Sequence, residues 1–393
     1  MTTKRRRTKG EGSITKMTNN KYRVRLDCGY VDGKRKQLSG TADSLTEARV
    51  LLRGFMKLRD EADVVVSMNM TFEALAKNFM EYKKSRTRVK ETTLYHYTSN
   101  LNSLQENFKG KVISKISTKD VDEFITKLRR EGKKESTIRL RLTVLGLVFK
   151  YAIKTLKILH KNPLEDCLYV EGATLKKDIE ILSESEFEAL RGILQEVYAA
   201  HLEKYPQKKP DNSSLCYIAF LLAYELGLRE GEVLGLRWSR IDFQRHLVHI
   251  DNQRIKVGAI TKDGTPKSKA SDRVIVVSDG LIKILAKHKA SFQFSEQDDY
   301  VFSKDFNGTK ILLAESLRSS FKRFLLKAGI TRHFTFHMLR HTNATRLIEL
   351  TGNDYKTVSE RLGHASVSVT FNVYAHAIKK QHQLAANLMD CTK

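Results

Sequence analysis

Between residues 70 and 160, apolar residues recur at helical spacing, and this periodicity constrains the fold more than any other feature of the chain. Val121, Phe124, Ile125 and Leu128 show the pattern, because residues three and four positions apart lie on one face of a helix. Breaks in the periodicity divide the block into separate helices. We predict helices at residues 71–85, 90–108, 117–132 and 134–156, with Thr71 capping the first.

The segment before this block has the alternation of β-strands. Residues 12–41 contain three short runs separated by the turn signals Asn19-Asn20 and Asp32-Gly33. In the run "KYRVRL" apolar and cationic residues alternate, so one face of the strand is apolar and the other carries Lys21, Arg23 and Arg25. A helix at 44–60, with Ser44 and Glu47 at capping-box spacing, completes the predicted unit. Its cationic face fits a DNA groove; the alternative is an ordinary solvated surface.

The remainder of the chain has a mixed pattern. It begins with a helix near 181–194, where Ser183 precedes Glu186 at capping-box spacing. Helices are predicted at 214–226 and 230–238, strands within 241–278, a turn-rich connector over "KDGTPKSKAS" (262–271), and further helices to the end. We therefore expect an α+β, mostly helical chain of three domains with a linker near 61–69. The predicted domains are 1–62, 70–165 and 178–393.

The charge of the chain favours a polyanionic partner. It has 70 Lys and Arg residues against 45 Asp and Glu, a net charge of +25. The helical block alone has 20 Lys and Arg against 9 Asp and Glu, so basic residues are spread along the chain. Nucleic acid is the simplest such partner, and an extended duplex footprint suits the spread. The alternatives are a merely basic surface or association with ribosomes. A basic arm containing Arg5, Arg6 and Arg7 precedes the strands.

Several other classes lack sequence support. No apolar run approaches a membrane span, and the N-terminus lacks the apolar core of a secretory signal, so a cytoplasmic location is expected. Phosphate-binding loops, dinucleotide fingerprints and zinc-protease motifs do not occur in the sequence. The scattered Cys28, Cys167, Cys216 and Cys391 favour neither disulfides nor a zinc site. We expect no cofactor and no metal.

A dispersed set of polar residues remains unexplained by folding alone. The phrases that contain it are "GLREGEVLGLRW", "HMLRHTNATR" and "LGHASVSVTFNVYAH". Each residue has an ordinary explanation when taken singly. Arg229 could pair with Glu232, His337 and Arg340 could form a solvated helix face, and Tyr374 could fill the core.

Taken together, these phrases resemble the tyrosine recombinase (phage integrase) family. The order Arg, Lys, His-x-x-Arg, Leu-Gly-His and Tyr is that of the family, and the N-terminal sheet and helical block are similar to three-domain integrases of phages and conjugative transposons. The resemblance implies a helical SAM-like core-binding domain and a catalytic domain that recombines DNA at specific sites. It also implies a 3′-phosphotyrosyl intermediate, a Holliday junction, and integration and excision of a mobile element.

The resemblance assigns a role to each residue of the set. Tyr374 would attack the scissile phosphate, and Arg229 and Arg340 would hold its non-bridging oxygens. His337 would serve in proton transfer or phosphate contact, and His364 would hydrogen-bond the phosphate. Lys269 would protonate the leaving 5′-oxygen, with Lys267 as the alternative on the same connector. Tyr355 precedes the Leu-Gly-His phrase, so the family order rejects it as the nucleophile.

The resemblance also implies partners and a location. Double-stranded DNA with core-type and arm-type sites, a homotetramer on that DNA, an excisionase and a host DNA-bending protein are the expected partners, in a bacterial nucleoid. Residues 379–393 would be donated to a neighbouring protomer, or would pack on their own domain. Two other functions compete: a non-catalytic architectural DNA-binding protein, and a type IB topoisomerase that relaxes DNA.

Overall fold

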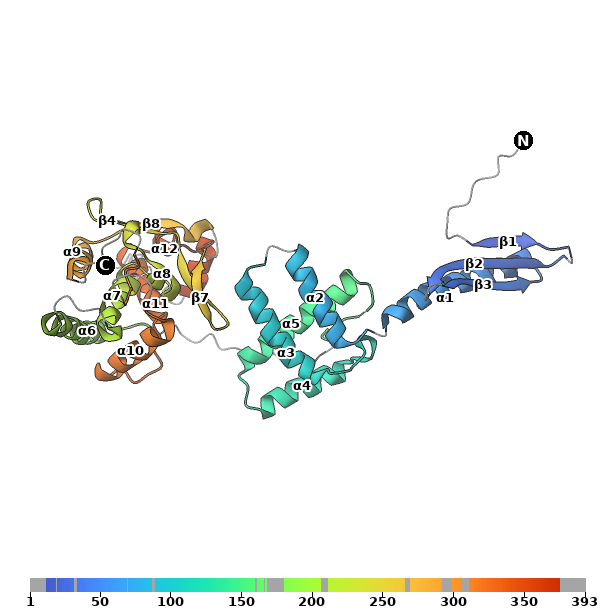
Figure 1. Cartoon of the computed structure of the whole chain (residues 1–393), viewed down its shortest axis with the longest axis horizontal. Coiled ribbons are helices and arrows are strands. Elements are labelled where there is room, and N and C mark those ends of the chain that lie inside the picture. Colours follow the sequence, from blue (N-terminus) through green and yellow to red (C-terminus); the bar gives the residue numbers. More distant parts are fainter. Residues whose placement is uncertain are drawn as a thin grey trace, which may run out of the picture. The chain divides into compact units, whose positions relative to one another are not determined.

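The chain forms two compact units, Met1–Ala173 and Thr174–Lys393, which we describe separately (Figure 1). The computed structural model describes residues 12–18, 20–31, 34–68, 70–86, 89–159, 161–165, 167, 180–205, 211–265, 269–291, 299–304 and 311–374. The predictions made for Arg5, Arg6, Arg7, Lys267 and residues 379–393 lie outside these residues. The side chains of Lys269 and Tyr374 also lie outside the description, although their backbone is included.

The first unit begins with an antiparallel sheet in the order β1 (Ser13–Lys16), β2 (Tyr22–Val31) and β3 (Lys34–Ala42). The predicted alternation is confirmed, because Val24 and Leu26 of β2 are buried while Arg23 and Arg25 are exposed. Helix α1 (Leu45–Met68) packs on the sheet. It approaches closely at Gly40, where an added Cβ would lie 3.0 Å from a methyl of Leu51.

The predicted linker at 61–69 is wrong for residues 61–68, which continue α1. The helix begins as expected, with the backbone N–H of Glu47 donating to Ser44 Oγ at 3.1 Å. No Pro or Gly occurs between Gly54 and Met68, so nothing in this stretch breaks the backbone hydrogen-bond pattern.

Four helices form the rest of the first unit, as predicted: α2 (Phe72–Arg86), α3 (Glu91–Asn107), α4 (Thr118–Arg130) and α5 (Glu135–Lys154), with a 3₁₀ turn η1 (Ile113–Lys115). Their core is rich in phenylalanine, and its fully buried rings include Phe72, Phe108 and Phe149. Ser117 and Asp120 form a capping box at the start of α4. Thr71 accepts the N–H of Ala74 at 3.4 Å, at the start of α2.

The second unit is built around α7 (Asn212–Glu225). Every residue from Ser214 to Ala223 is buried, so this helix is apolar all round and other helices cover it. The helices of this unit besides α7 are α6 (Glu184–Lys204), α8 (Glu230–Gly235), α9 (Asp279–Ser291), α10 (Ala314–Lys327), α11 (Met338–Leu350), α12 (Tyr355–Leu362) and α13 (Val367–Tyr374). Helices α6, α8, α10 and α11 contact α7 directly.

The strands of the second unit fall in the predicted region. Strands β4 (Ile241–Asp242), β5 (Leu247–Ile250) and β8 (Arg273–Val276) form an antiparallel sheet in that order, and β6 (Gln253–Val257) pairs with β7 (Ile260–Gly264) as a separate hairpin. Two 3₁₀ turns, η2 (Trp238–Arg240) and η3 (Lys269–Ser271), flank them.

Two predicted boundaries in this region are wrong. The connector expected from residue 262 instead begins after Gly264, because Asp263 pairs across the hairpin with Arg254. The helix expected at 230–238 ends at Gly235, whose Cα faces Gln253 so closely that an added Cβ would lie 2.9 Å from the Gln253 Cα. Among the helices that the structure describes, none has the length and apolar character needed to cross a bilayer.

Candidate active site

Arg340 is the buried centre of the site. It lies in the first turn of α11 and is 3% exposed. Its Nη1 donates to the Gly227 carbonyl at 2.6 Å, and its Nη2 donates to the Leu362 carbonyl at 2.7 Å. The solvated-face interpretation is therefore wrong for Arg340, which joins α11 to the segment before Arg229 and to the end of α12.

Arg229 reaches the same corner from the start of α8. Its Nη1 donates to Glu232 Oε1 at 2.6 Å, so the ordinary pairing proposed for these two residues exists. Its Nη2 also donates to the Gly363 carbonyl at 3.3 Å. The two guanidiniums thus hold the consecutive carbonyls of Leu362 and Gly363, directly before His364.

Glu232 and Arg273 support Arg229 from within the protein. Both side chains are buried, and Arg273 Nη2 donates to Glu232 Oε2 at 3.1 Å. Burial alone would raise the pKa of Glu232, but Arg273 and Arg229 together hold that pKa below its usual value. Arg273 Nε also donates to the Arg361 carbonyl at 2.7 Å, which fixes the end of α12. The site therefore has an ionised carboxylate shared by two arginines.

His364 follows a left-handed turn at Gly363, whose φ is 67°. A Cβ at Gly363 would lie 2.8 Å from the Ala270 carbonyl, so both the backbone conformation and the space require glycine here. His364 Nδ1 lies 2.7 Å from Thr370 Oγ1, which orients the ring. Burial, with the positive charges of Arg340, Arg229 and Arg273, lowers the pKa of His364 to about 4. The imidazole is neutral at physiological pH.

His337 precedes α11 and lies beside His341, with ring centroids 5.1 Å apart and the ring planes perpendicular. The His337 side chain is exposed at the surface, and partial desolvation there, together with the positive charges of Arg340 and Arg229, lowers its pKa. Burial and the neighbouring His337 and Arg340 lower the pKa of His341 to about 4. Both rings are therefore neutral proton acceptors near pH 7, beside two permanent cations.

The turn that contains Lys269 contacts the same corner. Ser271 Oγ donates to the Gly363 carbonyl at 3.4 Å, and the Ala270 carbonyl packs against the Gly363 Cα. Lys269 is the first residue of this turn, η3. Lys269 therefore lies two residues before Ser271, whose hydroxyl bonds the same Gly363 carbonyl that Arg229 bonds.

Tyr374 is the last residue of α13. Thr370, which contacts His364, is fully buried and lies four residues earlier, so positions 370 and 374 share one face of the helix. Tyr355 lies at the opposite end of α12 from Gly363 and packs edge-on against Phe371, with ring centroids 5.5 Å apart. Burial raises the pKa of Tyr355. These contacts give Tyr355 a packing role.

Sequence reasoning missed Arg273 and His341 as members of the site. Arg273 had a usable signal, because in "RVIVV" it alternates with Ile275 and Val277, and all three are buried. An arginine on the buried side of a strand must have a partner, and Glu232 is that partner. His341 had no comparable signal.

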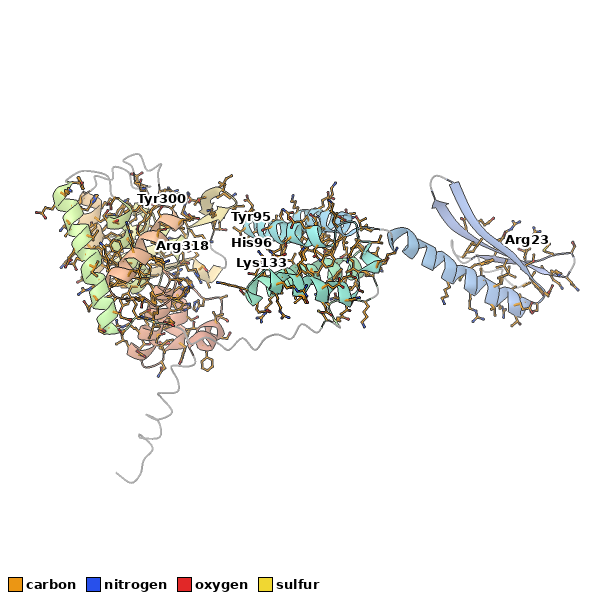
Figure 2. All side chains as sticks on the ribbon, turned by 90° about the horizontal axis from the view of Figure 1, so that it is seen from below. Arg23, Tyr95, His96, Lys133, Tyr300 and Arg318 are labelled. Atoms are coloured by element: carbon orange, nitrogen blue, oxygen red, sulfur yellow. The ribbon has the colours of Figure 1, made fainter. Side chains whose placement is uncertain are left out.

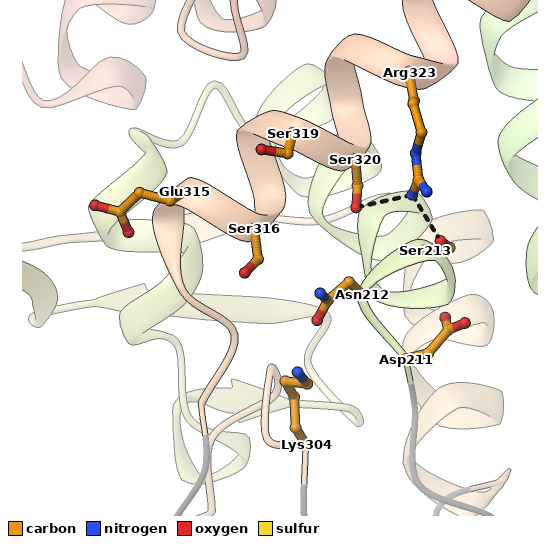
Figure 3. Close-up of a pocket in the computed structure, with 9 residues that line it drawn as sticks. All are labelled: Asp211, Asn212, Ser213, Lys304, Glu315, Ser316, Ser319, Ser320 and Arg323. Carbon is orange, nitrogen blue, oxygen red and sulfur yellow. Dashed lines mark hydrogen bonds between the residues drawn. The ribbon is translucent and has the colours of Figure 1, made fainter.

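The carboxylate of this site, that of Glu232, is paired with Arg229 and Arg273. Within the part of the chain that the structure describes, no three His, Cys, Asp or Glu side chains come together as a metal ion would require. A separate groove of about 850 Å³ lies between the start of α7 and α10 (Figure 3). Its walls include Ser213 and Ser320, both bonded by Arg323, and it shares no residue with the arginine-histidine cluster.

Two arginine forks, neutral histidines and a nearby lysine turn suit a phosphodiester that is broken and rejoined. The fold and the site thus define a tyrosine site-specific recombinase, an enzyme that integrates and excises DNA. The chain belongs to the phage integrase family: the Phage integrase family matches residues 182–381, and the Phage integrase, N-terminal SAM-like domain matches residues 76–155.

Two relatives agree with this membership. A protein named Tyrosine recombinase XerC-like, from Caldanaerobacter subterraneus subsp. tengcongensis, is 30% identical over 72% of this chain and 72% of its own length. The ICEBs1 integrase of Bacillus subtilis strain 168 is 26% identical over 96% of this chain and 99% of its own length.

The fold is also similar to solved integrases. The Tn1549 transposon integrase, solved with transposon right end DNA, matches with a TM-score of 0.64 at 20% identity, over 81% of this chain and 99% of its own. A lambda integrase dimer bound to a COC′ core site matches with a TM-score of 0.57 at 17% identity, over 94% of this chain and 96% of its own.

Proposed function

We propose that this recombinase cleaves DNA with Tyr374 as the nucleophile, within a phosphate site made by Arg229 and Arg340. The observation that carries the proposal is that both guanidiniums converge on the consecutive Leu362 and Gly363 carbonyls, next to His364. Carbonyl oxygens and phosphate oxygens are both acceptors for guanidinium N–H donors, so this corner brings two permanent positive charges to a place where acceptor oxygens are bound.

The reaction follows from the chemistry of these groups. The Tyr374 oxygen attacks phosphorus and forms a P–O bond, and its phenolic proton passes to a neutral histidine, His337. The bond from phosphorus to the 5′-oxygen breaks, and that oxygen takes the electron pair and a proton from the Lys269 ammonium. The arginines stabilise the extra charge on the phosphoryl oxygens. The covalent 3′-phosphotyrosine conserves the bond energy, so the reverse steps rejoin DNA without another energy source.

The lowered pKa values of the histidines fit these roles. A neutral His337 can accept a proton, whereas an imidazolium could not. His364 uses Nδ1 to contact Thr370, which leaves Nε2 as the nitrogen for a hydrogen bond to the phosphate. Because Thr370 lies on the face of α13 that leads to position 374, the same contact couples His364 to the helix that ends at Tyr374.

The first unit supplies DNA-binding surfaces in this proposal. Arg23 (Figure 2) and Arg25 lie on the exposed face of β2, opposite Thr15 and Ser13 of β1, so guanidiniums and hydroxyls lie together on this face. Lys21 pairs with Asp43 at 2.8 Å, and contact with phosphate would compete with that pair. We assign arm-type DNA to residues 1–62, including Arg5, Arg6 and Arg7, core-type DNA to residues 70–165, and catalysis to residues 178–393.

The assembly and setting are part of the same proposal. The partner is double-stranded DNA bearing the attachment sites of a mobile element. Four protomers act on it, as in the solved lambda integrase tetramer bound to a Holliday junction. An excisionase and a host DNA-bending protein set the direction of recombination, and the enzyme works in the cytoplasm at the nucleoid.

A nicked suicide substrate tests the proposal. Cleavage releases a short strand from such DNA, so the covalent protein–DNA adduct accumulates. We expect an adduct with the parent protein and none with Tyr374→Phe, while both bind the site equally. An equal amount of adduct from Tyr374→Phe would overturn the assignment. Exchange of strands between two sites, rather than relaxation of supercoils alone, separates the recombinase from a topoisomerase.

A further inference from the structure

Four polar side chains are joined at the open base of the β6–β7 hairpin. Asp263 Oδ2 accepts from Tyr300 Oη at 2.5 Å and from Arg237 Nη2 at 3.0 Å, and its Oδ1 accepts from Arg254 Nη1 at 3.0 Å. We call Asp263, Tyr300, Arg237 and Arg254 the Asp263 clamp. Figure 2 labels Tyr300, which is 8% exposed.

The two arginines of the clamp make further contacts besides those to Asp263. Arg237 Nη2 also donates to Tyr300 Oη at 2.8 Å, and its guanidinium carbon lies 4.2 Å from the centroid of the Tyr300 ring. Arg254 Nη2 donates to the Thr261 carbonyl at 3.1 Å, which ties β6 to β7. Burial would raise the pKa of Asp263, but the hydrogen bonds from Tyr300, Arg254 and Arg237 lower it, so the carboxylate is ionised.

The hairpin depends on such contacts for its position. It is two-stranded and separate from the β4-β5-β8 sheet, and an isolated hairpin is only marginally stable. It also packs on α8, where a Cβ on Gly231 would lie 2.8 Å from the Arg254 carbonyl, and it is tied to α10 by Lys256, whose Nζ donates to Glu315 Oε1 at 2.6 Å. Helix α8 begins directly after Arg229. The clamp therefore helps to fix the position of the end of β7 relative to Arg229, which we place on the phosphate.

The chain runs from the clamp towards Lys269. Asp263 lies next to the last residue of β7, Gly264, and Lys269 follows five residues later. Beyond Lys269, Ser271 bonds the Gly363 carbonyl and Arg273 bonds Glu232. Polar contacts thus fix the chain at Asp263, before Lys269, and at Ser271 and Arg273, after it.

We propose that the Asp263 clamp is a positioning site for the strand end that leads to Lys269, and that protonation of the leaving 5′-oxygen by Lys269 depends on it. The inference rests on the proposed function, because Lys269 is the proton donor there. In this proposal Asp263 and Tyr300 influence the reaction indirectly. They act through the backbone of β7, and their loss displaces the proton donor without removing it.

A substrate with sulfur in place of the bridging 5′-oxygen isolates this effect. In ordinary DNA the P–O bond breaks with its electron pair going to oxygen, which needs the proton from Lys269. In the sulfur substrate the P–S bond breaks and the pair leaves as a thiolate. A thiol has a pKa of only about 8.5, so the thiolate departs without protonation. A variant with a missing or misplaced proton donor should therefore cleave the sulfur substrate at close to the parent rate. A variant with a general defect of the site should cleave both substrates slowly.

The experiment compares single-turnover cleavage of both substrates by the full-length protein and its variants. Asp263→Asn and Tyr300→Phe should each cleave ordinary DNA about 10- to 100-fold more slowly, and sulfur DNA at close to the parent rate. The second variant removes one hydroxyl and keeps the buried ring, so it tests the clamp if the first folds poorly. Glu186→Gln is the matched control, because Glu186 also accepts from a guanidinium, that of Arg332, at 2.9 Å in a separate cluster. The ratio of its cleavage rates on sulfur DNA and ordinary DNA should equal that of the parent.

Lys269→Ala and Lys267→Ala test the identity of the proton donor separately from the positioning role of the clamp. If sulfur restores Lys269→Ala but not the clamp variants, the positioning role of the clamp is wrong and the role of Lys269 stands. If sulfur fails to restore Lys269→Ala, the proton donor is misassigned, and the inference fails with it. Restoration of Lys267→Ala in place of Lys269→Ala would likewise move the proton donor to Lys267 and overturn the inference. Slow cleavage of both substrates by Tyr300→Phe would also overturn the proposal.

Discussion

The carboxylate of Glu232 is bonded to the guanidinium of Arg229 across the first turn of α8, with Oε1 2.6 Å from Nη1. Glu232→Gln should lower the free energy of unfolding by about 3 kcal/mol, because two buried or half-buried arginines lose their counter-charge. Denaturant unfolding measures the change. Adduct formation should fall as well, since Arg229 is no longer held.

Glu230→Gln is the control for that prediction. Glu230, whose side chain is 17% exposed, pairs with Arg318, whose side chain is 61% exposed, so water screens this pair more than the Glu232 pairs and its loss should cost less, about 1 kcal/mol. Equal losses from the two variants would show that the buried pair contributes no more than the exposed one.

Gly363→Ala should damage both stability and cleavage. The left-handed backbone strains any L-residue, and the new Cβ would also press on the Ala270 carbonyl at 2.8 Å. Gly329→Ala provides the comparison, because Gly329 has a φ of 76° and nothing within 4 Å of an added Cβ. We expect a loss of about 1 to 2 kcal/mol at Gly329 from backbone strain alone and a larger loss at Gly363. Unfolding curves for both variants measure the difference, and equal losses would exclude the crowding.

Arg340→Lys should slow cleavage strongly while DNA binding persists. The arginine reaches two carbonyls, of Gly227 and Leu362, through two nitrogens of one planar group. A lysine ammonium keeps the charge but cannot hold that fork geometry. We expect adduct formation to slow by about 100-fold or more, with the affinity for DNA measured in parallel. Cleavage at the parent rate would show that charge alone suffices.

The pKa of His364, lowered to about 4 from 6.5, predicts a pH dependence of stability. Between these values the unfolded chain binds a proton at this residue and the folded chain does not. Stability contributed by the neutral ring is therefore fully present above the unfolded value and falls as the pH drops from about 6.5 to 4. His364→Gln should lose less stability over this window than the parent in parallel unfolding experiments. Identical slopes would contradict the lowered pKa.

The sequence predicted those features that depend on the spacing of apolar residues or on the order of the family's polar residues along the chain. The helices of the first unit and the alternation of β2 follow from local apolar spacing, and the family order singled out Arg229 and Arg340 without any knowledge of contacts. The linker was mispredicted at 61–68 because this stretch contains no Pro or Gly to end the helix that begins at Leu45.

Other features depend on contacts between distant segments. No local pattern indicates that Arg340 bonds Gly227, more than a hundred residues earlier, or that Asp263 meets Tyr300. Those contacts arise when α7, α11 and the hairpin pack together. The roles of the individual site residues stay predictions, since they concern a DNA complex.

The most direct test of the account is to locate the DNA on the protein after cleavage of the suicide substrate. Trypsin cuts after Arg346, Lys356, Arg361 and Lys379, so Tyr355 and Tyr374 fall in different peptides. Mass spectrometry after nuclease trimming should find the nucleotide phosphate on the peptide spanning 362–379, at Tyr374. The same mass on the peptide spanning 347–356, or on none of the tyrosines, would contradict the account.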